Sequence, residues 1–407
     1  MRPVASLLVG TGLLLIGVGL LNTLIPLRGI VAGYSGTLLG GLTSAYYAGY
    51  FIGTFAMPPL VRRIGHIRAF AFCAVCAACV VLLHAFGSDP VLWLLLRLAT
   101  GVVLVGLYAV IESWLNAQAD TRQRGTVFAA YMIVNLAGLA LGQQLLRVGG
   151  QAFVLFTVVA LAVCAATLPV LLTRQAQPQP QATPKLQLGL LFGAAPTAGA
   201  GALLSGLAMG AFWGLLPVYA RRQGFDTATV GTYMSIAIVG GAALQWPLGK
   251  MSDRHDRRAV LAGVAGAAAA LALAALAMGG REWIAMALVF LFGGMAFAVY
   301  PIVVAHLVEH VAPDHLMGAS SSVLLVYGVG SAVGPLAAGA LMSVFGAWAL
   351  FGWFALIHAL LALYATYRWR TRQREPTRLR RFLPMLRTTP AAMRILRNPT
   401  KPHEEMS

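Results

Sequence analysis

The stretch Gln245-Trp-Pro-Leu-Gly-Lys-Met-Ser-Asp-Arg-His-Asp-Arg-Arg258 lies where a long apolar run changes into a dense patch of charge. Apolar segments long enough to cross a bilayer, at 228–249 and 259–279, flank the patch. Clustered basic residues of this kind typically end membrane helices and occupy cytoplasmic loops. The stretch therefore predicts a short loop between two membrane-spanning helices.

The composition extends this interpretation to the whole chain. Of 407 residues, 59% are hydrophobic and only 10% are charged, whereas soluble domains are about 25% charged. A helix needs about 20 apolar residues to span the hydrocarbon core. Twelve runs of suitable length lie near 4–25, 36–60, 68–86, 91–116, 126–147, 152–172, 199–220, 228–249, 259–279, 283–309, 318–343 and 347–369. The sequence predicts an all-α, polytopic membrane protein.

The spacing Gly249-x-x-x-Asp253-Arg254-x-x-Arg257-Arg258 resembles the loop motif of the major facilitator superfamily. A degraded copy at 58–68 keeps Arg63 but has Arg62 where the family has Asp. The resemblance implies twelve transmembrane helices in two pseudo-symmetric six-helix bundles. The predicted divisions are bundles at 1–173 and 197–370, a cytoplasmic linker at 174–196 and a basic cytoplasmic tail at 371–407. The resemblance also assigns Arg63 and the motif residues of the second copy to gating.

Further stretches resemble one bacterial subgroup of this superfamily, the YcaD-like transporters. They are Glu112-Ser-Trp-Leu-Asn116, Gln245-Trp-Pro, Tyr300-Pro301 and Tyr327-Gly-Val-Gly. These matches occur in both halves of the chain, and they do not identify a substrate.

An internal repeat supports two related halves. Pro26, Gly40, Gly49 and Arg63 recur 191 residues later as Pro217, Gly231, Gly240 and Arg254. Gly101, Tyr108, Gly138 and Gly142 recur 192 residues later as Gly293, Tyr300, Gly330 and Gly334. Eight matches in order at one spacing are much harder to obtain by chance than any single match.

The distribution of Lys and Arg predicts the orientation. With a cytoplasmic N-terminus, twenty-three basic residues fall in inside segments and five in outside segments. The positive-inside rule then places both termini in the cytoplasm. The resemblance to a bacterial subgroup implies that the chain lies in the inner membrane. The net charge of +17 follows from this topology, so nucleic-acid binding is not needed to explain it. The basic tail either contacts anionic lipid or is disordered.

Polar and aromatic residues mark a candidate substrate cavity. In the resembling family, the first, fourth, seventh and tenth helices line the cavity, which implies roles for Asn22, its repeat mate Trp213, and Tyr300. Trp213 could instead be an interfacial anchor. The complete set of cavity candidates is Asn22, Tyr46, Tyr50, Arg97, Tyr108, Asn135, Trp213, Tyr300 and Tyr327.

The segment 91–116 carries the strongest signal. Arg97, Gly101, Tyr108 and Glu112 lie within about 60° of one another around a helix. An Arg inside the hydrocarbon region usually faces a bundle interior and marks a transport path, although it could also extend to the interface. In the resembling family, the corresponding Arg takes part in proton coupling. Glu112, near the cytoplasmic end, is expected to pair with Arg62, Arg63 or Arg68 as a latch.

Other reactive residues have simpler interpretations. Cys73, Cys76 and Cys79 lie among Ala and Val and are expected to behave as small apolar residues. His306 and Glu309 could carry protons or form a polar helix end. No metal site or cofactor is expected.

The leading hypothesis is a monomeric secondary transporter that uses alternating access, is coupled to protons and exports its substrate. No Walker motif is present, so an ion or substrate gradient would supply the energy. With no carboxylate expected at mid-depth, the cavity favours a neutral or anionic small molecule. The alternative is a membrane scaffold or sensor that retains the fold without transport. An intramembrane enzyme ranks third.

Overall fold

A computed structural model describes residues 2–118, 124–150, 152–172, 186–278 and 281–371. The described chain is helical throughout. The first half contains α1 (Arg2–Val31), α2 (Gly36–Ile64), α3 (His66–Leu83), α4 (Pro90–Gln118), α5 (Arg124–Gln144), the short η1 (Leu145–Val148), α6 (Ala152–Ala165) and α7 (Thr167–Leu171). The second half contains α8 (Leu188–Ala194), α9 (Pro196–Arg222), α10 (Thr227–Arg254), α11 (Arg257–Met278), α12 (Glu282–His310), α13 (Leu316–Phe345) and α14 (Ala349–Thr371).

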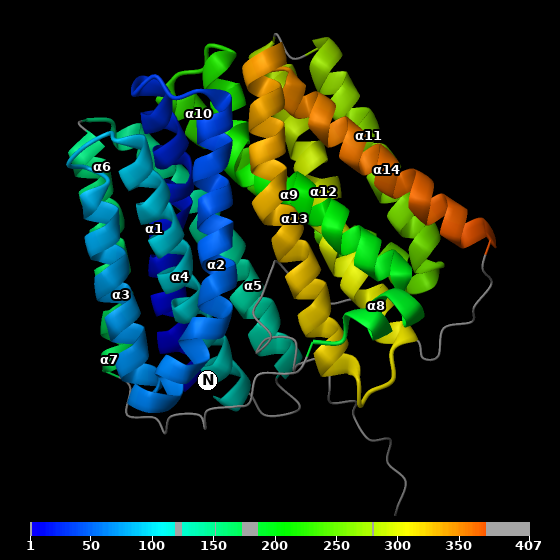
Figure 1. Cartoon of the computed structure of the whole chain (residues 1–407), viewed down its shortest axis with the longest axis horizontal. Coiled ribbons are helices and arrows are strands. Elements are labelled where there is room, and N and C mark those ends of the chain that lie inside the picture. Colours follow the sequence, from blue (N-terminus) through cyan, green and yellow to red (C-terminus); the bar gives the residue numbers. More distant parts are fainter. Residues whose placement is uncertain (1, 119–123, 151, 173–185, 279–280, 372–407) are drawn as a thin grey trace, which may run out of the picture.

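Eleven described segments are long and apolar enough to cross a membrane, with α6 and α7 forming one of them. The twelfth expected segment is α2, which has 29 residues and packs along α4 and α13. Its glycines, threonines and tyrosines lower its mean hydropathy. These residues contact neighbouring helices or line a cavity between the bundles. Figure 1 shows the two bundles side by side, with α1–α7 in one and α9–α14 in the other.

The internal repeat is also seen at the N-termini of α2 and α10. Ser35 caps α2 by accepting a hydrogen bond from the backbone N–H of Leu38, at 3.2 Å. Asp226, 191 residues on, caps α10 by accepting from the N–H of Thr229 at 2.7 Å. Side-chain oxygens at this position satisfy backbone donors that the first helical turn leaves free.

Glycines occupy matching helix crossings in the two halves. A Cβ on Gly49 would overlap the carbonyl oxygen of Leu98, and one on Gly240 would overlap that of Phe290. Gly142 and Gly334 lie in the same way against Ile16 and Leu207. In each pair both glycines and both partners are related by the repeat spacing. Only glycine permits these close backbone approaches between membrane helices.

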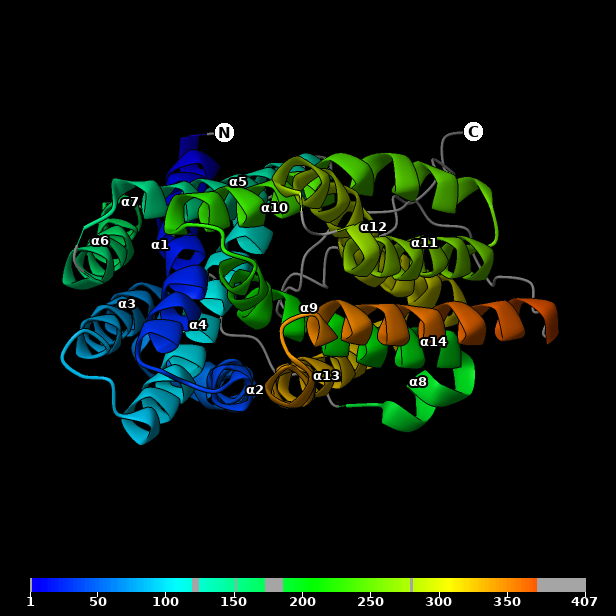
Figure 2. The same cartoon turned by 90° about the horizontal axis from the view of Figure 1, so that it is seen from above.

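Contacts between the halves gather at the end that carries the α1–α2 turn, which we call the closed end. Figure 2 shows α2 beside α13 and α5 beside α10. Gly40 abuts the carbonyl of Pro335, and its repeat mate Gly231 abuts the carbonyl of Gln143. The Ser343 hydroxyl accepts from the N–H of Thr37 at 2.8 Å.

Hydrogen bonds between α5 and α10 extend the closed end. The amide of Gln144 donates to the Ser235 hydroxyl at 2.6 Å, and that hydroxyl donates to the carbonyl of Ala140 at 2.8 Å. Arg147 donates to Thr232 at 2.7 Å. These contacts seal the two bundles together at one end of the helices.

The predicted linker is partly helical. α8 and the first residue of α9 fall inside 174–196, and the ring of Phe192 packs over Gly199. The run of Gln and Pro at 177–181 favours a flexible linker and gives no sign of the short apolar helix that follows it. The predicted tail beyond residue 371 lies outside the described residues.

Candidate functional site: the cavity between the bundles

A cavity lies between the two bundles and contains about 970 Å³ of empty space, counting the part open to solvent. Helices α1, α2, α4 and α5 line it from the first half, and α9 and α13 from the second. Eight of the nine cavity candidates named from the sequence line it, namely Asn22, Tyr46, Tyr50, Arg97, Tyr108, Asn135, Trp213 and Tyr327.

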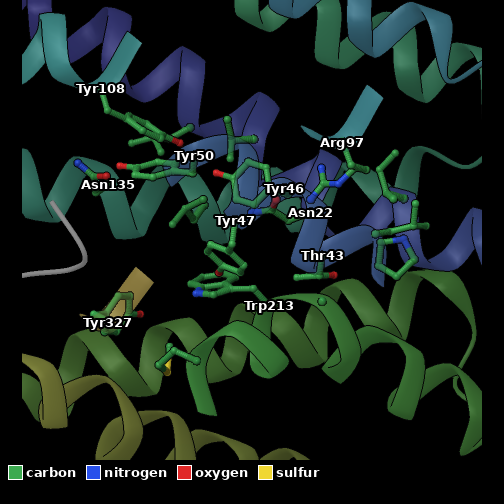
Figure 3. A pocket seen from close by; sticks show the side chains of 18 of the residues that line it. Asn22, Thr43, Tyr46, Tyr47, Tyr50, Arg97, Tyr108, Asn135, Trp213 and Tyr327 are labelled. Atoms are coloured by element: carbon green, nitrogen blue, oxygen red, sulfur yellow. The ribbon is translucent and has the colours of Figure 1, made fainter. Parts of the chain in front are cut away.

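Tyrosine and tryptophan rings form a large part of the cavity wall. Tyr46 contacts Tyr47 and Tyr50 at ring-centroid distances of 5.2 and 6.3 Å, and Tyr50 contacts Tyr108 at 6.4 Å. Figure 3 shows Tyr46, Tyr50 and Tyr108 on one side of the cavity, Trp213 and Tyr327 on the other, and the Tyr47 ring between Tyr46 and Trp213 in this view. Trp213 packs against Phe297 at 5.7 Å within its own bundle. It is therefore a cavity wall and not an interfacial anchor.

Arg97 lies inside the bundle. Its side chain is 4% exposed and lines the cavity, with the guanidinium carbon 4.7 Å from the centroid of the Tyr46 ring. An Arg that extended to the membrane surface would be exposed. The close approach of α2 and α4, where Gly101 abuts the carbonyl of Tyr46, brings the ring and the cation together.

Glu112 does not lie where the sequence predicts. It is 3% exposed, lines the cavity and accepts a hydrogen bond from the hydroxyl of Tyr131 at 3.0 Å. Arg62, Arg63 and Arg68 are exposed, so the expected latch is replaced by a carboxylate facing the cavity. The expectation concerned carboxylates at mid-depth, and Glu112, near the other end of α4 from Arg97, shows that the cavity wall includes a carboxylate.

Other residues complete the description of the wall. Asn135 donates to the backbone carbonyl of Tyr131 at 2.9 Å. Tyr300 is not among the described residues that line the cavity; its ring packs behind Tyr327, with centroids 4.7 Å apart. Sequence reasoning omits Thr43 and Tyr47, which line the cavity. They form an i, i+3, i+4 set with Tyr46, a helical spacing that could have identified them.

The loop motif of the second half forms an ion-pair network. Arg257 lies 3.1 Å from Asp253 and 2.8 Å from Glu309, which ties α10, α11 and α12 together. Gly249 is buried in α10, whereas Arg254, like its repeat mate Arg63, is exposed. The gating role of these residues stays a prediction.

Asp256 and Arg258 add a second ion pair at 2.7 Å. The Asp256 carboxylate also accepts the backbone N–H of Arg258 at 2.8 Å, at the start of α11. Burial alone would raise the pKa of Asp256, but the hydrogen bonds from Arg258 outweigh it and lower that pKa below its ordinary value.

The first half has a hydrogen bond at the corresponding place. His66 is the repeat mate of Arg257, and its Nε2 lies 3.2 Å from the hydroxyl of Ser113 on α4. Among the described residues, the second half has the ion pair of Arg257 and Glu309 there instead.

His306 lies outside the cavity. It is buried next to His310, with ring centroids 4.1 Å apart, in a small pocket that Arg258 and Arg368 also line. Its position beside the ion-pair network fits the polar helix end considered from the sequence.

The family model described as Major Facilitator Superfamily matches residues 7–196 and 198–400. The chain belongs to the major facilitator superfamily. The motif spacing, the repeat and the paired bundles described above are those of this superfamily, which comprises transporters of small molecules and not enzymes.

Curated relatives within the superfamily are MFS-type transporters named YcaD and described as uncharacterized. The proteins from Salmonella typhimurium (strain LT2) and Salmonella typhi are each 32% identical over 346 residues, which covers 84% of this chain and 89% of the relative. This similarity supports the subgroup resemblance noted from the sequence and makes the chain a multi-pass membrane protein related to bacterial transporters.

Solved structures share the fold. The nucleoside transporter NupG superimposes with a TM-score of 0.75 at 17% identity, covering 91% of this chain and all of that one. A bacterial homolog of the human lysosomal transporter Spinster gives a TM-score of 0.73 at 14% identity, covering 89% of this chain and 96% of that one. At such identities the likeness establishes the fold alone.

Proposed function

We propose that this protein is a proton-coupled secondary transporter that exports a small molecule across the bacterial inner membrane by alternating access. The observation that carries the proposal is the cavity between two pseudo-symmetric bundles, sealed at one end by contacts between the halves. Rocking of one bundle against the other would open that end and close the opposite one.

The proposed direction of transport follows from the predicted orientation of the chain in the membrane. With both termini in the cytoplasm, the closed end faces outward and the cavity receives its substrate from the cytoplasm. That state suits the loading step of an exporter. The cavity-lining residues then serve as the substrate site, and the loop motif of α10 and α11 helps to control rocking.

Glu112 is the proposed proton carrier. It is the only carboxylate among the described residues that line the cavity, so a proton and a substrate could use the same passage. His306 and Glu309 lie outside the cavity in the ion-pair region. Burying a carboxylate inside a membrane bundle costs free energy, and such a group usually marks an ion or proton path.

Purified protein in proteoliposomes tests this proposal. Thermal shifts across a metabolite library select compounds that bind, and counterflow with radiolabelled forms of those compounds measures exchange. We expect Glu112→Gln to retain counterflow but to lose substrate movement driven by a pH gradient, because the variant carries no exchangeable proton.

Glu282→Gln is the control, since it removes the charge of an exposed glutamate in the first turn of α12, outside the cavity and the ion-pair network. It should retain gradient-driven movement once its folding is verified by size-exclusion chromatography. Full gradient-driven movement by Glu112→Gln would eliminate Glu112 as the proton carrier. A complete lack of counterflow for every compound that binds would argue against transport.

A further inference from the structure

Arg97 is a buried cation with donors that the protein leaves unused. Within the described chain, its Nε and Nη1 atoms are buried and have no hydrogen-bond partner. The Tyr46 ring lies beside it, 4.7 Å away. The face of a ring attracts a cation, but it does not supply the in-plane lone pairs that a guanidinium fork matches.

No carboxylate of the described cavity wall can neutralise this charge. Glu112 is fifteen residues further along α4, which is about 22 Å at 1.5 Å per residue, and it already accepts from Tyr131. Removing a cation from water costs more free energy than a single cation–π contact returns. The site is therefore electrostatically incomplete and complementary to an anion.

The surroundings of Arg97 are flat and aromatic. Tyr46, which carries the cation over its face, also contacts the rings of Tyr47 and Tyr50. Trp213 from α9 lies across the cavity from Tyr46 and Tyr50, and the Tyr47 ring is drawn between Tyr46 and Trp213 (Figure 3). Aromatic walls facing one another favour a planar ring between them, since such rings prefer offset or edge contacts at about 4.5–7 Å.

We propose that the cavity binds a small organic anion that carries a planar ring. The anionic group would pair with the guanidinium of Arg97 near the closed end, and the ring would lie between Tyr46 and Trp213. This inference rests on the proposed transport function, and it narrows the substrate from any small molecule to an aromatic acid. The pairing would satisfy the unused donors and exclude amines.

A matched series of probes tests the charge. Phenylacetate, phenylacetamide and phenethylamine share a ring and differ in charge, and isothermal titration calorimetry on the purified full chain measures their binding. We expect phenylacetate to bind at least about tenfold more tightly than the amide, a difference of 1.4 kcal/mol, and the amine to bind most weakly. Cyclohexylacetate and acetate test the ring and should bind more weakly than phenylacetate.

Variants test whether Arg97 causes the preference for phenylacetate over the uncharged amide. Arg97→Gln should remove the advantage of phenylacetate over phenylacetamide, and Arg97→Lys should reduce it, because an ammonium lacks the planar fork. Arg281→Gln, at an exposed position before α12, should leave the advantage unchanged. If Arg97→Gln does not fold, the charge series on the unaltered protein decides.

Equal or tighter binding of the amide or amine overturns the inference, as does failure of the folded protein to bind any of the carboxylates. Acetate binding as tightly as phenylacetate overturns the aromatic part. Counterflow with the same probes separates this inference from the proposed function. Anion-selective binding without counterflow contradicts transport but leaves the site, whereas counterflow with no preference for anions leaves transport and contradicts the site.

Discussion

At the scale of single residues, glycines determine how closely the membrane helices approach. Gly49 and Gly240 lie against backbone carbonyls of the neighbouring helix in both halves. Backbone cannot move aside as a flexible side chain can. Gly49 permits the close α2–α4 crossing. That crossing also brings the Tyr46 ring next to the Arg97 guanidinium, so the packing of small residues positions this charge in the cavity.

We predict that Gly49→Ala lowers the unfolding midpoint of the detergent-solubilised protein, because its Cβ would overlap the carbonyl of Leu98. Overpacking of this kind costs about 1–3 kcal/mol. Gly263→Ala is the matched control in α11, where an added Cβ meets no atom within 4 Å. Its midpoint should equal or exceed that of the unaltered protein. An unchanged midpoint for Gly49→Ala would show that α2 and α4 separate without cost.

The cavity residues also show how much of the site the sequence can predict. The stripe of Arg97, Tyr108 and Glu112 on one helix face is recognisable from the helical period, and all three line the cavity. The partner of Glu112 is not recognisable in this way, because Tyr131 comes from a different helix and meets Glu112 only through tertiary packing. Symmetry with Tyr108 predicts a cavity position for Tyr300, but packing against Tyr327 puts it behind the wall.

At the scale of elements, the two inner loops make different contacts within the part of the chain that the structure describes. In the second half, Arg257 pairs with Glu309 of α12, and Arg258 pairs with Asp256 inside the α10–α11 turn. In the first half, the single Gly65 with φ of +82° separates α2 from α3, and His66 makes a hydrogen bond to Ser113. The two copies of the motif also differ in sequence, since Arg62 replaces the acidic residue.

We predict that Asp256→Ala lowers the free energy of unfolding by about 0.5–2 kcal/mol at neutral pH, as expected for loss of a helix cap. Asp256→Asn should lose less, since its amide oxygen can still accept the N–H of Arg258 while its charge is gone. Because the folded-state pKa of Asp256 is lowered, its charge contributes stability above the unfolded pKa of about 3.9. That contribution disappears as the pH falls through the folded value.

Unfolding midpoints measured from neutral pH down to about pH 3, below the unfolded pKa, check this prediction. The difference between the unaltered protein and Asp256→Asn should shrink over the acidic part of the range. The deficit of Asp256→Ala should shrink by the same amount and leave the part that is due to the lost helix cap. A difference for Asp256→Asn that stays constant at every pH would show that the Asp256 charge does not stabilise the turn.

At the scale of the whole molecule, two bundles meet through contacts that are confined, among the described hydrogen bonds and glycine contacts, to one end. Repeat-related pairs make part of this seal, since Gly40 on Pro335 corresponds to Gly231 on Gln143. The proposed alternating access requires this seal to open and a second one to form at the opposite end.

The overall fold is largely predictable from the sequence. Hydropathy locates the membrane segments within a few residues, and the 191-residue spacing is enough to relate the two halves to each other. The helix α8 and the sealed end are not predictable, because they depend on contacts between segments far apart in the chain. The sealed end belongs to one conformation. The proposed alternating access implies that the same sequence adopts another conformation, in which that end is open.

Labelling of a single cavity cysteine tests the central claim most directly. In a background without the four native cysteines, Asn22→Cys places a thiol in the cavity near the closed end, and Thr37→Cys with Ser343→Cys allows that end to be locked by a disulfide. Oriented membrane vesicles are then exposed to a membrane-impermeant maleimide from each side, with and without the lock.

The account predicts labelling of Asn22→Cys from both sides of the membrane when the closed end is free, and only from the side of the N-terminus when the disulfide is formed. Reduction of the disulfide should restore labelling from both sides. Labelling from one side only in the unlocked protein, or from both sides in the locked protein, would contradict alternating access through this cavity.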